Sequence, residues 1–200
     1  MEVSHMIKSS RPVTLSRRNA LLAGGVTLSG AAVALLAGRP ALAAKHADGH
    51  SAQKDAGVLN TALALEHEGI NAYTLGAQSN LLEKPVLTLA LKFQDDHKAH
   101  RDRLIAVLHT LGATPVQEKS LSEYASELEV SKLKTQTDVL NFAAGLEQGA
   151  VNAYLGIIPS FGDPALAKLA GQLASDETVH FAILSQALGR PLPAPLSFGV

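Results

Sequence analysis

Two pairs of polar residues at helical spacing carry the clearest chemical signal in this sequence. Glu177 and His180 lie three residues apart in "DETVH", and His97 and His100 have the same spacing in "DDHKAH". Residues three apart share one face of a helix, so each pair would present two donor groups together. Carboxylates and imidazoles are ligands for iron, manganese and other divalent metals. The two pairs are therefore candidate metal ligands, although a Glu–His pair at this spacing is frequently a surface interaction of small value.

Two further glutamates occur in similar contexts. One lies in "LEHEGINAY" and the other in "LEQGAVNAY", and each falls on the apolar stripe of a predicted helix. Taken alone, an inward glutamate is usually solvated at the edge of the stripe, and an inward histidine is usually hydrogen-bonded. Together, three carboxylates and three imidazoles buried without a cation would be strongly unfavourable, so the set favours a metal site. The candidate ligands are Glu66, His97, His100, Glu147, Glu177 and His180.

Four amphipathic helices must position these residues. Apolar periodicity, proline and glycine predict helices over residues 55–82, 85–111, 137–158 and 164–188, with a short helix near 122–128. The short links predict two antiparallel hairpins, and the longer polar connection between them permits a crossover. One inward glutamate from each of two helices, plus one donor pair from each of the other two, is the geometry that holds two metals inside a bundle.

The two predicted hairpins repeat each other in sequence. The two glutamate-containing stretches align at an offset of 81 and end in Tyr73 and Tyr154, while His100 aligns with His180 at an offset of 80. The repeat predicts a pseudo-twofold bundle. We interpret the two tyrosines as packing residues that make one hydrogen bond each, rather than as redox-active groups.

The composition excludes several other kinds of site. The chain has 200 residues, 46% of them hydrophobic, with a formal net charge of −1 and no cysteine. Without thiols there can be no disulfide framework and no thiolate-held metal, so any transition metal must be held by histidine and carboxylate. The near-neutral charge gives no bias toward nucleic acid or anionic membranes. This composition suits one compact domain.

The first 43 residues are predicted to be a signal peptide. Ser16, Arg17, Arg18 and Leu21 resemble the S-R-R-x-x-L pattern of twin-arginine signals, and a small-residue site predicts cleavage after Ala43. An uncleaved membrane anchor is the alternative, which the glycines of the apolar stretch and the cleavage site disfavour. We therefore expect export by the twin-arginine machinery to the periplasm or another exported location, with no membrane association after cleavage.

The rest of the chain divides into three predicted parts. Residues 44–54 are polar, small and rich in histidine, which is typical of a flexible tail. The helical bundle is predicted over residues 55–190, and residues 191–200 are predicted to form a C-terminal tail.

These motifs resemble the ferritin-like superfamily, and specifically exported bacterial ferritin-like domain proteins with a twin-arginine signal. The resemblance covers about residues 55–189 and rests on the six candidate ligands in the stretches quoted above. It implies an all-α, antiparallel four-helix bundle with a dinuclear iron or manganese centre, other divalent metals being admitted. It also implies either oxidation of ferrous iron or consumption of oxygen or peroxide, or else a non-catalytic metal-binding or structural stress-related role. A homo-oligomer is compatible with either role.

One position departs from the superfamily pattern. The second helix offers His97 where the resemblance implies a glutamate. With four carboxylates, two divalent cations are neutralised (+4 − 4 = 0), whereas Glu66, Glu147 and Glu177 alone leave +4 − 3 = +1. A more positive site favours the reduced metal or takes up an anion. Asp96 is the alternative source of a fourth carboxylate, but its shorter side chain and its offset from the apolar stripe favour His97.

Overall fold

The computed structural model describes residues 52–199, in which every regular element is helical. Four long helices form an antiparallel bundle, as predicted: α4 (Ala52–Gln78), α5 (Lys84–Thr110), α7 (Gln136–Ile157) and α8 (Pro164–Ala187). Three short elements complete the fold: α6 (Leu121–Glu127) and the 3-10 turns η1 (Val130–Lys132) and η2 (Ile158–Ser160). None of the helices from residue 52 onward combines the length and the hydropathy needed to cross a bilayer.

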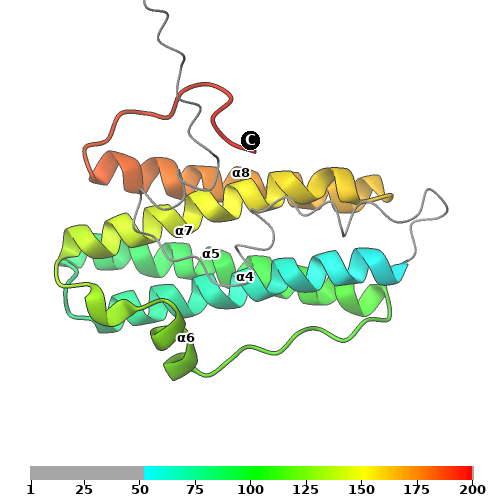
Figure 1. Ribbon diagram of the computed structural model, residues 1–200, viewed down its shortest axis with the longest axis horizontal. Coiled ribbons are helices and arrows are strands. Elements are labelled where there is room, and N and C mark those ends of the chain that lie inside the picture. The colour runs from blue at the N-terminus through cyan, green and yellow to red at the C-terminus, as the bar shows by residue number, and fades with distance from the viewer. Residues whose placement is uncertain (1–51, 200) are drawn as a thin grey trace, which may run out of the picture.

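The bundle consists of two helix hairpins, α4–α5 and α7–α8, joined by a long crossover (Figure 1). The crossover runs back along the bundle after α5, so α7 begins at the same end as α5 and runs in the same direction. This is the connection that the long polar segment permitted. As a result, α4 and α7 lie side by side as antiparallel neighbours that belong to different hairpins.

The crossover is attached to the bundle by specific contacts. The side-chain amide of Asn60 on α4 donates to the Thr114 carbonyl at 3.0 Å, and its oxygen accepts from the backbone N–H of Val116 at 2.7 Å. Farther along, α6 buries Tyr124 and Leu128 against α4. The crossover therefore covers one flank of α4.

The helix ends follow from local sequence. Gly112 and Gly189 adopt positive φ angles of 70° and 66°, and each is followed by a residue whose N–H bonds a carbonyl five residues earlier. This is the Schellman arrangement, which glycine adopts without a Cβ penalty. At the start of α7, Thr135 and Asp138 form a reciprocal capping box. The ends of α5, α7 and α8 fall within a residue of their predicted positions.

The first helix differs from its predicted range at both ends. It begins at Ala52, so the last residues of the segment predicted as a 44–54 tail are helical. It ends at Gln78 rather than at residue 82, because Asn80 adopts a left-handed conformation with a φ of 59° that a helix cannot contain. The predicted signal peptide and the remainder of the predicted tail lie outside the described residues.

The core consists of apolar layers on either side of a polar middle. One apolar cluster contains Leu63 of α4, Leu104 of α5 and Leu173 of α8. A second cluster, toward the other end of the bundle, contains Phe93 of α5 and Phe181 of α8. The six candidate ligands lie between these clusters along all four long helices. The bundle thus shields them from water at both ends.

Candidate metal centre

All six predicted ligands meet in the middle of the bundle. Each is buried, with exposed fractions from 0% to 8%. They form two overlapping groups of four, and in each group one donor atom per residue lies within 4.8 Å of the other three. The first group is Glu66, His97, His100 and Glu177, and the second is His97, Glu147, Glu177 and His180. The two groups share His97 and Glu177.

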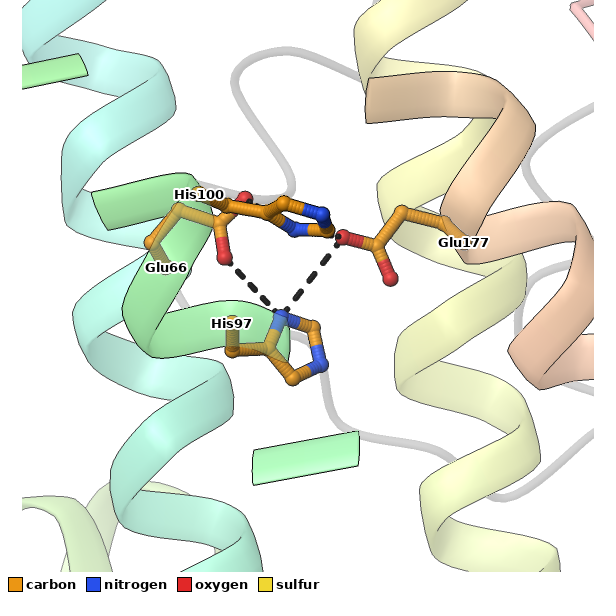
Figure 2. A group of neighbouring side chains, drawn as sticks. All are labelled: Glu66, His97, His100 and Glu177. Atoms are coloured by element: carbon orange, nitrogen blue, oxygen red, sulfur yellow. Dashed lines mark hydrogen bonds and ion pairs between the residues drawn. The ribbon is translucent and has the colours of Figure 1, made fainter. Parts of the chain in front are cut away.

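The first group joins α4, α5 and α8 (Figure 2). Nδ1 of His97 lies 2.9 Å from Oε2 of Glu66 and 3.5 Å from Oε1 of Glu177. Nδ1 of His100 lies 3.1 Å from the same Glu177 oxygen and 3.6 Å from Oε1 of Glu66. Two imidazole nitrogens and two carboxylates therefore converge on one point.

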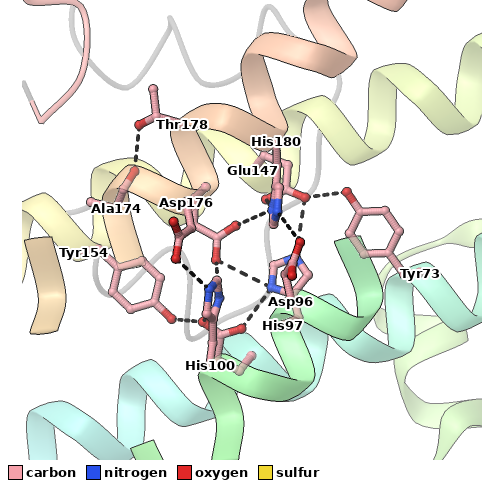
Figure 3. Close-up of polar contacts among 12 residues, drawn as sticks. Tyr73, Asp96, His97, His100, Glu147, Tyr154, Ala174, Asp176, Thr178 and His180 are labelled. Atoms are coloured by element: carbon pink, nitrogen blue, oxygen red, sulfur yellow. Dashed lines mark hydrogen bonds and ion pairs between the residues drawn. The ribbon is translucent and has the colours of Figure 1, made fainter. Parts of the chain in front are cut away.

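The second group mirrors the first across the bundle (Figure 3). Nδ1 of His180 lies 3.1 Å from Oε2 of Glu177 and 3.5 Å from Oε2 of Glu147. The other ring nitrogen of His97, Nε2, lies 3.4 Å from Oε1 of Glu147. The pseudo-twofold symmetry predicted from the repeat is thus present in the donor set itself.

Asp96 does not complete the donor set as a fourth carboxylate. Its Oδ2 instead lies 3.4 Å from Nε2 of His180, on the opposite hairpin, and the residue is in neither four-residue group. Asp176 makes the equivalent contact from α8, with its Oδ2 at 3.2 Å from Nε2 of His100 (Figure 3). Each aspartate thus binds the far ring nitrogen of a histidine whose Nδ1 faces the centre.

Glu66 and Glu147 each accept a hydrogen bond from a tyrosine hydroxyl of the other hairpin. Tyr73 of α4 donates to Oε1 of Glu147, and Tyr154 of α7 donates to Oε1 of Glu66. Burial, followed by the negative charge of the neighbouring glutamate, raises the pKa of both phenols well above the usual value. Both tyrosines therefore remain protonated donors, in agreement with their predicted role.

The donor residues perturb one another's ionisation. Burial alone would raise the pKa of Glu66, but its contacts with His100 and His97 outweigh that effect and lower the pKa to about 2. Burial alone would lower the pKa of both terminal histidines, yet their carboxylate contacts raise the pKa of His100 to about 10 and that of His180 to about 9. For Glu177, burial is the largest effect and raises the pKa. Without metal, protonated imidazoles supply the positive charge that the carboxylates require.

The donor set fits transition-metal ions on two counts. Oε2 of Glu147 is buried and has no hydrogen-bond partner among the described residues, although it points toward His180. A buried carboxylate oxygen in that state is costly unless a cation compensates it. In addition, mixed imidazole and carboxylate donors suit iron, manganese and zinc. These residues could therefore hold two metal ions.

A hollow between α4 and α7 borders this cluster. It is lined by small and apolar residues, including Gly69, Gly149 and Ala150, and reaches His97 and Glu147. Its empty space is about 420 Å³, part of it open to solvent. His97 and Glu147 therefore lie at the wall of this hollow, on the side of the centre where α4 and α7 meet.

Sequence reasoning did not identify two contributions to this site. These are Asp176 and the hydrogen bond that each tyrosine makes to a candidate ligand. A signal for the aspartates existed, because Asp96 and Asp176 each precede a terminal histidine by four residues and align at the offset of 80. Their contacts cross between hairpins, however, and helical spacing does not specify such contacts.

Comparisons with solved structures agree with the fold. A conserved hypothetical protein from Mycobacterium tuberculosis, rv2844, superposes with a TM-score of 0.61 at 21% identity, covering 74% of this chain and 99% of the other. A structure described as "ferritin like, diiron-carboxylate proteins" from Bacillus anthracis str. Ames gives a TM-score of 0.57 at 21% identity, covering 70% and 99%. No curated protein matches the sequence.

The sequence itself provides the decisive comparison. Residues 54–190 match the model of the family described as "Ferritin-like domain". The matched segment contains all four long helices and all six candidate ligands. This chain therefore belongs to the ferritin-like domain family.

Proposed function

We propose that the protein binds a dinuclear centre of iron or manganese, and that the loaded centre oxidises ferrous iron or consumes oxygen or peroxide. The observation that carries the proposal is the pair of overlapping donor groups, buried at the meeting point of all four long helices. The solved diiron-carboxylate neighbour has the same fold and supports the choice of metals.

In this proposal, the donors of the centre come from both hairpins. Glu66 and His100 would hold one ion, and Glu147 and His180 the other, with Glu177 shared between the two. When bound, redox-active ions supply the electrons that reduce oxygen or peroxide. The chain orients the donors through the tyrosine and aspartate contacts, and its apolar layers exclude water from the centre.

Metal analysis of the purified protein tests the binding proposal. Glu147→Gln and His180→Gln preserve approximate side-chain size while removing one donor each, so we expect metal content to fall in both variants. Asp102→Asn is the control, since this exposed residue pairs with Arg101 on the surface of α5. Metal content that both donor variants retain in full would refute the proposed centre.

A non-catalytic role is the second candidate, and the histidine at position 97 favours it. That residue leaves three carboxylates in the donor set, so the charge balance differs from a four-carboxylate site. Stopped-flow mixing of ferrous-loaded protein with oxygen or peroxide separates the two roles. An oxidase shows a fast oxidation phase that Glu147→Gln abolishes, whereas a metal-binding protein without catalysis shows no fast phase.

We also propose export through the twin-arginine route, on the basis of the motif at Ser16–Leu21. Replacing both arginines by lysine should retain the full-length precursor inside the cell, while the unaltered chain appears in the periplasmic fraction. N-terminal sequencing of the exported form should begin at Ala44. Equal export of the two forms would contradict this route.

A further inference from the structure

We infer that His97 bridges the two metal positions, with one ring nitrogen directed to each. This inference rests on the proposed dinuclear centre and concerns how its halves are joined. Nδ1 of His97 faces the first donor group, at 2.9 Å from Glu66 and 3.5 Å from Glu177 (Figure 2). Nε2 faces the second group, at 3.4 Å from Glu147. The imidazole ring therefore lies between the halves and has a donor atom on each side.

In the pseudo-twofold symmetry of the bundle, His97 of α5 is equivalent to Glu177 of α8. The two residues align at the offset of 80 and are the two members shared by both donor groups. Glu177 divides its oxygens between the halves, because Oε1 lies 3.1 Å from His100 and Oε2 lies 3.1 Å from His180. His97 divides its nitrogens in the same way. The site therefore has one bridging group from α5 and one from α8.

The surroundings of His97 hold its ring in this orientation. The residue is 4% exposed, and its ring centroid lies 5.4 Å from that of Tyr73 and 5.5 Å from that of His180. On the α4 side, a Cβ added to Gly69 would lie 3.2 Å from both Nδ1 and Cε1 of the ring. The glycine thus leaves the space that the ring occupies.

Bridging through both nitrogens also settles the charge of the centre. An imidazole bound to metal at both nitrogens has released its ring N–H proton to solvent and carries one negative charge. Two divalent cations, three glutamates and this ring then sum to +4 − 3 − 1 = 0. His97 would thus replace the missing carboxylate in charge as well as in position. A ring that binds one metal would instead keep its second N–H and leave the centre at +1.

Loading with Co²⁺ tests the bridge independently of any activity. We expect the unaltered protein to bind two Co²⁺ per chain. Because a whole imidazole ring lies between the two ions, X-ray absorption should show no cobalt neighbour within about 4 Å, the separation that is common in two-metal sites. The variant His97→Glu supplies a short carboxylate bridge, so it should bind two Co²⁺ with a cobalt neighbour inside that distance. His97→Gln should bind the second Co²⁺ at least tenfold more weakly. Circular dichroism checks that each variant keeps its helices.

The results of these measurements distinguish failure of the His97 bridge from failure of the dinuclear centre. Two Co²⁺ in the unaltered protein, with a short separation like that of His97→Glu, would overturn the bridge and leave the dinuclear centre in place. Unchanged affinity for both ions in His97→Gln would do the same. Fewer than two Co²⁺ in the unaltered protein would refute the dinuclear centre, and the bridge with it.

Discussion

Asp96 and Asp176 each contact the ring nitrogen of a terminal histidine that faces away from the centre. Each aspartate contacts Nε2 of a histidine on the opposite hairpin, at 3.4 Å for His180 and 3.2 Å for His100. A carboxylate at Nε2 keeps the proton there and leaves Nδ1 free to bind metal, because it fixes the tautomer and the orientation of the ring. We therefore expect the two aspartates to strengthen metal binding through the histidines that they contact.

Weakening these contacts should weaken metal binding without unfolding the protein. We expect Asp96→Asn and Asp176→Asn each to lower metal affinity by about 10–100-fold, the usual cost of losing such a partner. Asp95→Asn is the matched control, since the neighbouring Asp95 pairs with Lys98. Isothermal titration with Mn²⁺ measures the effect, and equal affinities in all three variants would show that the aspartates do not orient the histidines.

Because the residues of the same cluster ionise, the folding stability of the metal-free protein should depend on pH. Folding raises the pKa of His100 to about 10 and of His180 to about 9 from a usual value of 6.5, so their stabilising effect is complete below pH 6.5 and is lost as pH rises toward 9–10. The raised pKa of buried Glu177 means that its own contribution is lost as pH rises above 4.5. Folding lowers the pKa of Glu66 from 4.5 to about 2, so its contribution is lost as pH falls through that range.

Melting temperatures in the presence of a chelator measure this dependence. We expect the Tm to decline above pH 6.5 and again below pH 4.5, by about 2–4 °C for each kcal/mol of stability lost. His180→Gln should show a weaker decline on the alkaline side, because one of the titrating groups is gone. A Tm that stays constant from pH 6.5 to 9 would contradict the assigned charges.

How much of the site the sequence could predict depends on the range of the interaction. The inward placement of Glu66, His97 and Glu147 follows from helical periodicity, which depends only on nearby residues. Periodicity also puts Asp96 off the apolar stripe, but its contact with His180 depends on how α5 packs against α8. The two-sided position of the His97 ring is set by packing in the same way. Contacts between hairpins were therefore the part that sequence could not supply.

At the scale of the helices, α4 contributes space as well as ligands. Gly69 lies one turn beyond Glu66, and its missing side chain leaves room for the His97 ring. Gly57, nearer the start of α4, has no atom within 4 Å of an added Cβ. Two glycines in one helix thus have different roles, and only the structure distinguishes them.

Substituting each glycine by alanine should separate these roles. Gly57→Ala should stabilise the protein by about 0.5–1 kcal/mol, because alanine is the better helix former and the site is open. Gly69→Ala gains the same propensity but crowds the His97 ring, and overpacking typically costs about 1–3 kcal/mol. We therefore expect a lower Tm and weaker Mn²⁺ binding in Gly69→Ala than in Gly57→Ala. Equal stability and equal metal affinity in the two variants would show that the His97 ring moves aside without cost.

For the whole molecule, the donor set connects the two hairpins. Each donor group takes three residues from one hairpin and one from the other. Bound metal would therefore favour the docked state over any state in which the hairpins separate. Any ligand that binds the folded state alone raises its stability by mass action.

Metal should consequently raise the melting temperature in a concentration-dependent way. At a free Mn²⁺ concentration 100 times its Kd, we expect a gain of about 2.7 kcal/mol, or roughly 5–11 °C in Tm. Glu177→Gln should reduce this gain more than Glu66→Gln does, since Glu177 belongs to both donor groups and Glu66 to one. Calorimetric scans across a Mn²⁺ series make the comparison, and a Tm independent of Mn²⁺ in the unaltered protein would contradict a folded-state metal site.

The crossover has a further consequence for assembly. Because it joins the hairpins covalently, their docking is intramolecular, at an effective concentration on the order of millimolar for a flexible connection. Its attachment at Asn60 restricts it further and holds the second hairpin close to the first. A site assembled from two separate hairpin chains would dissociate on dilution. In this chain the donors of the two hairpins remain together at any protein concentration.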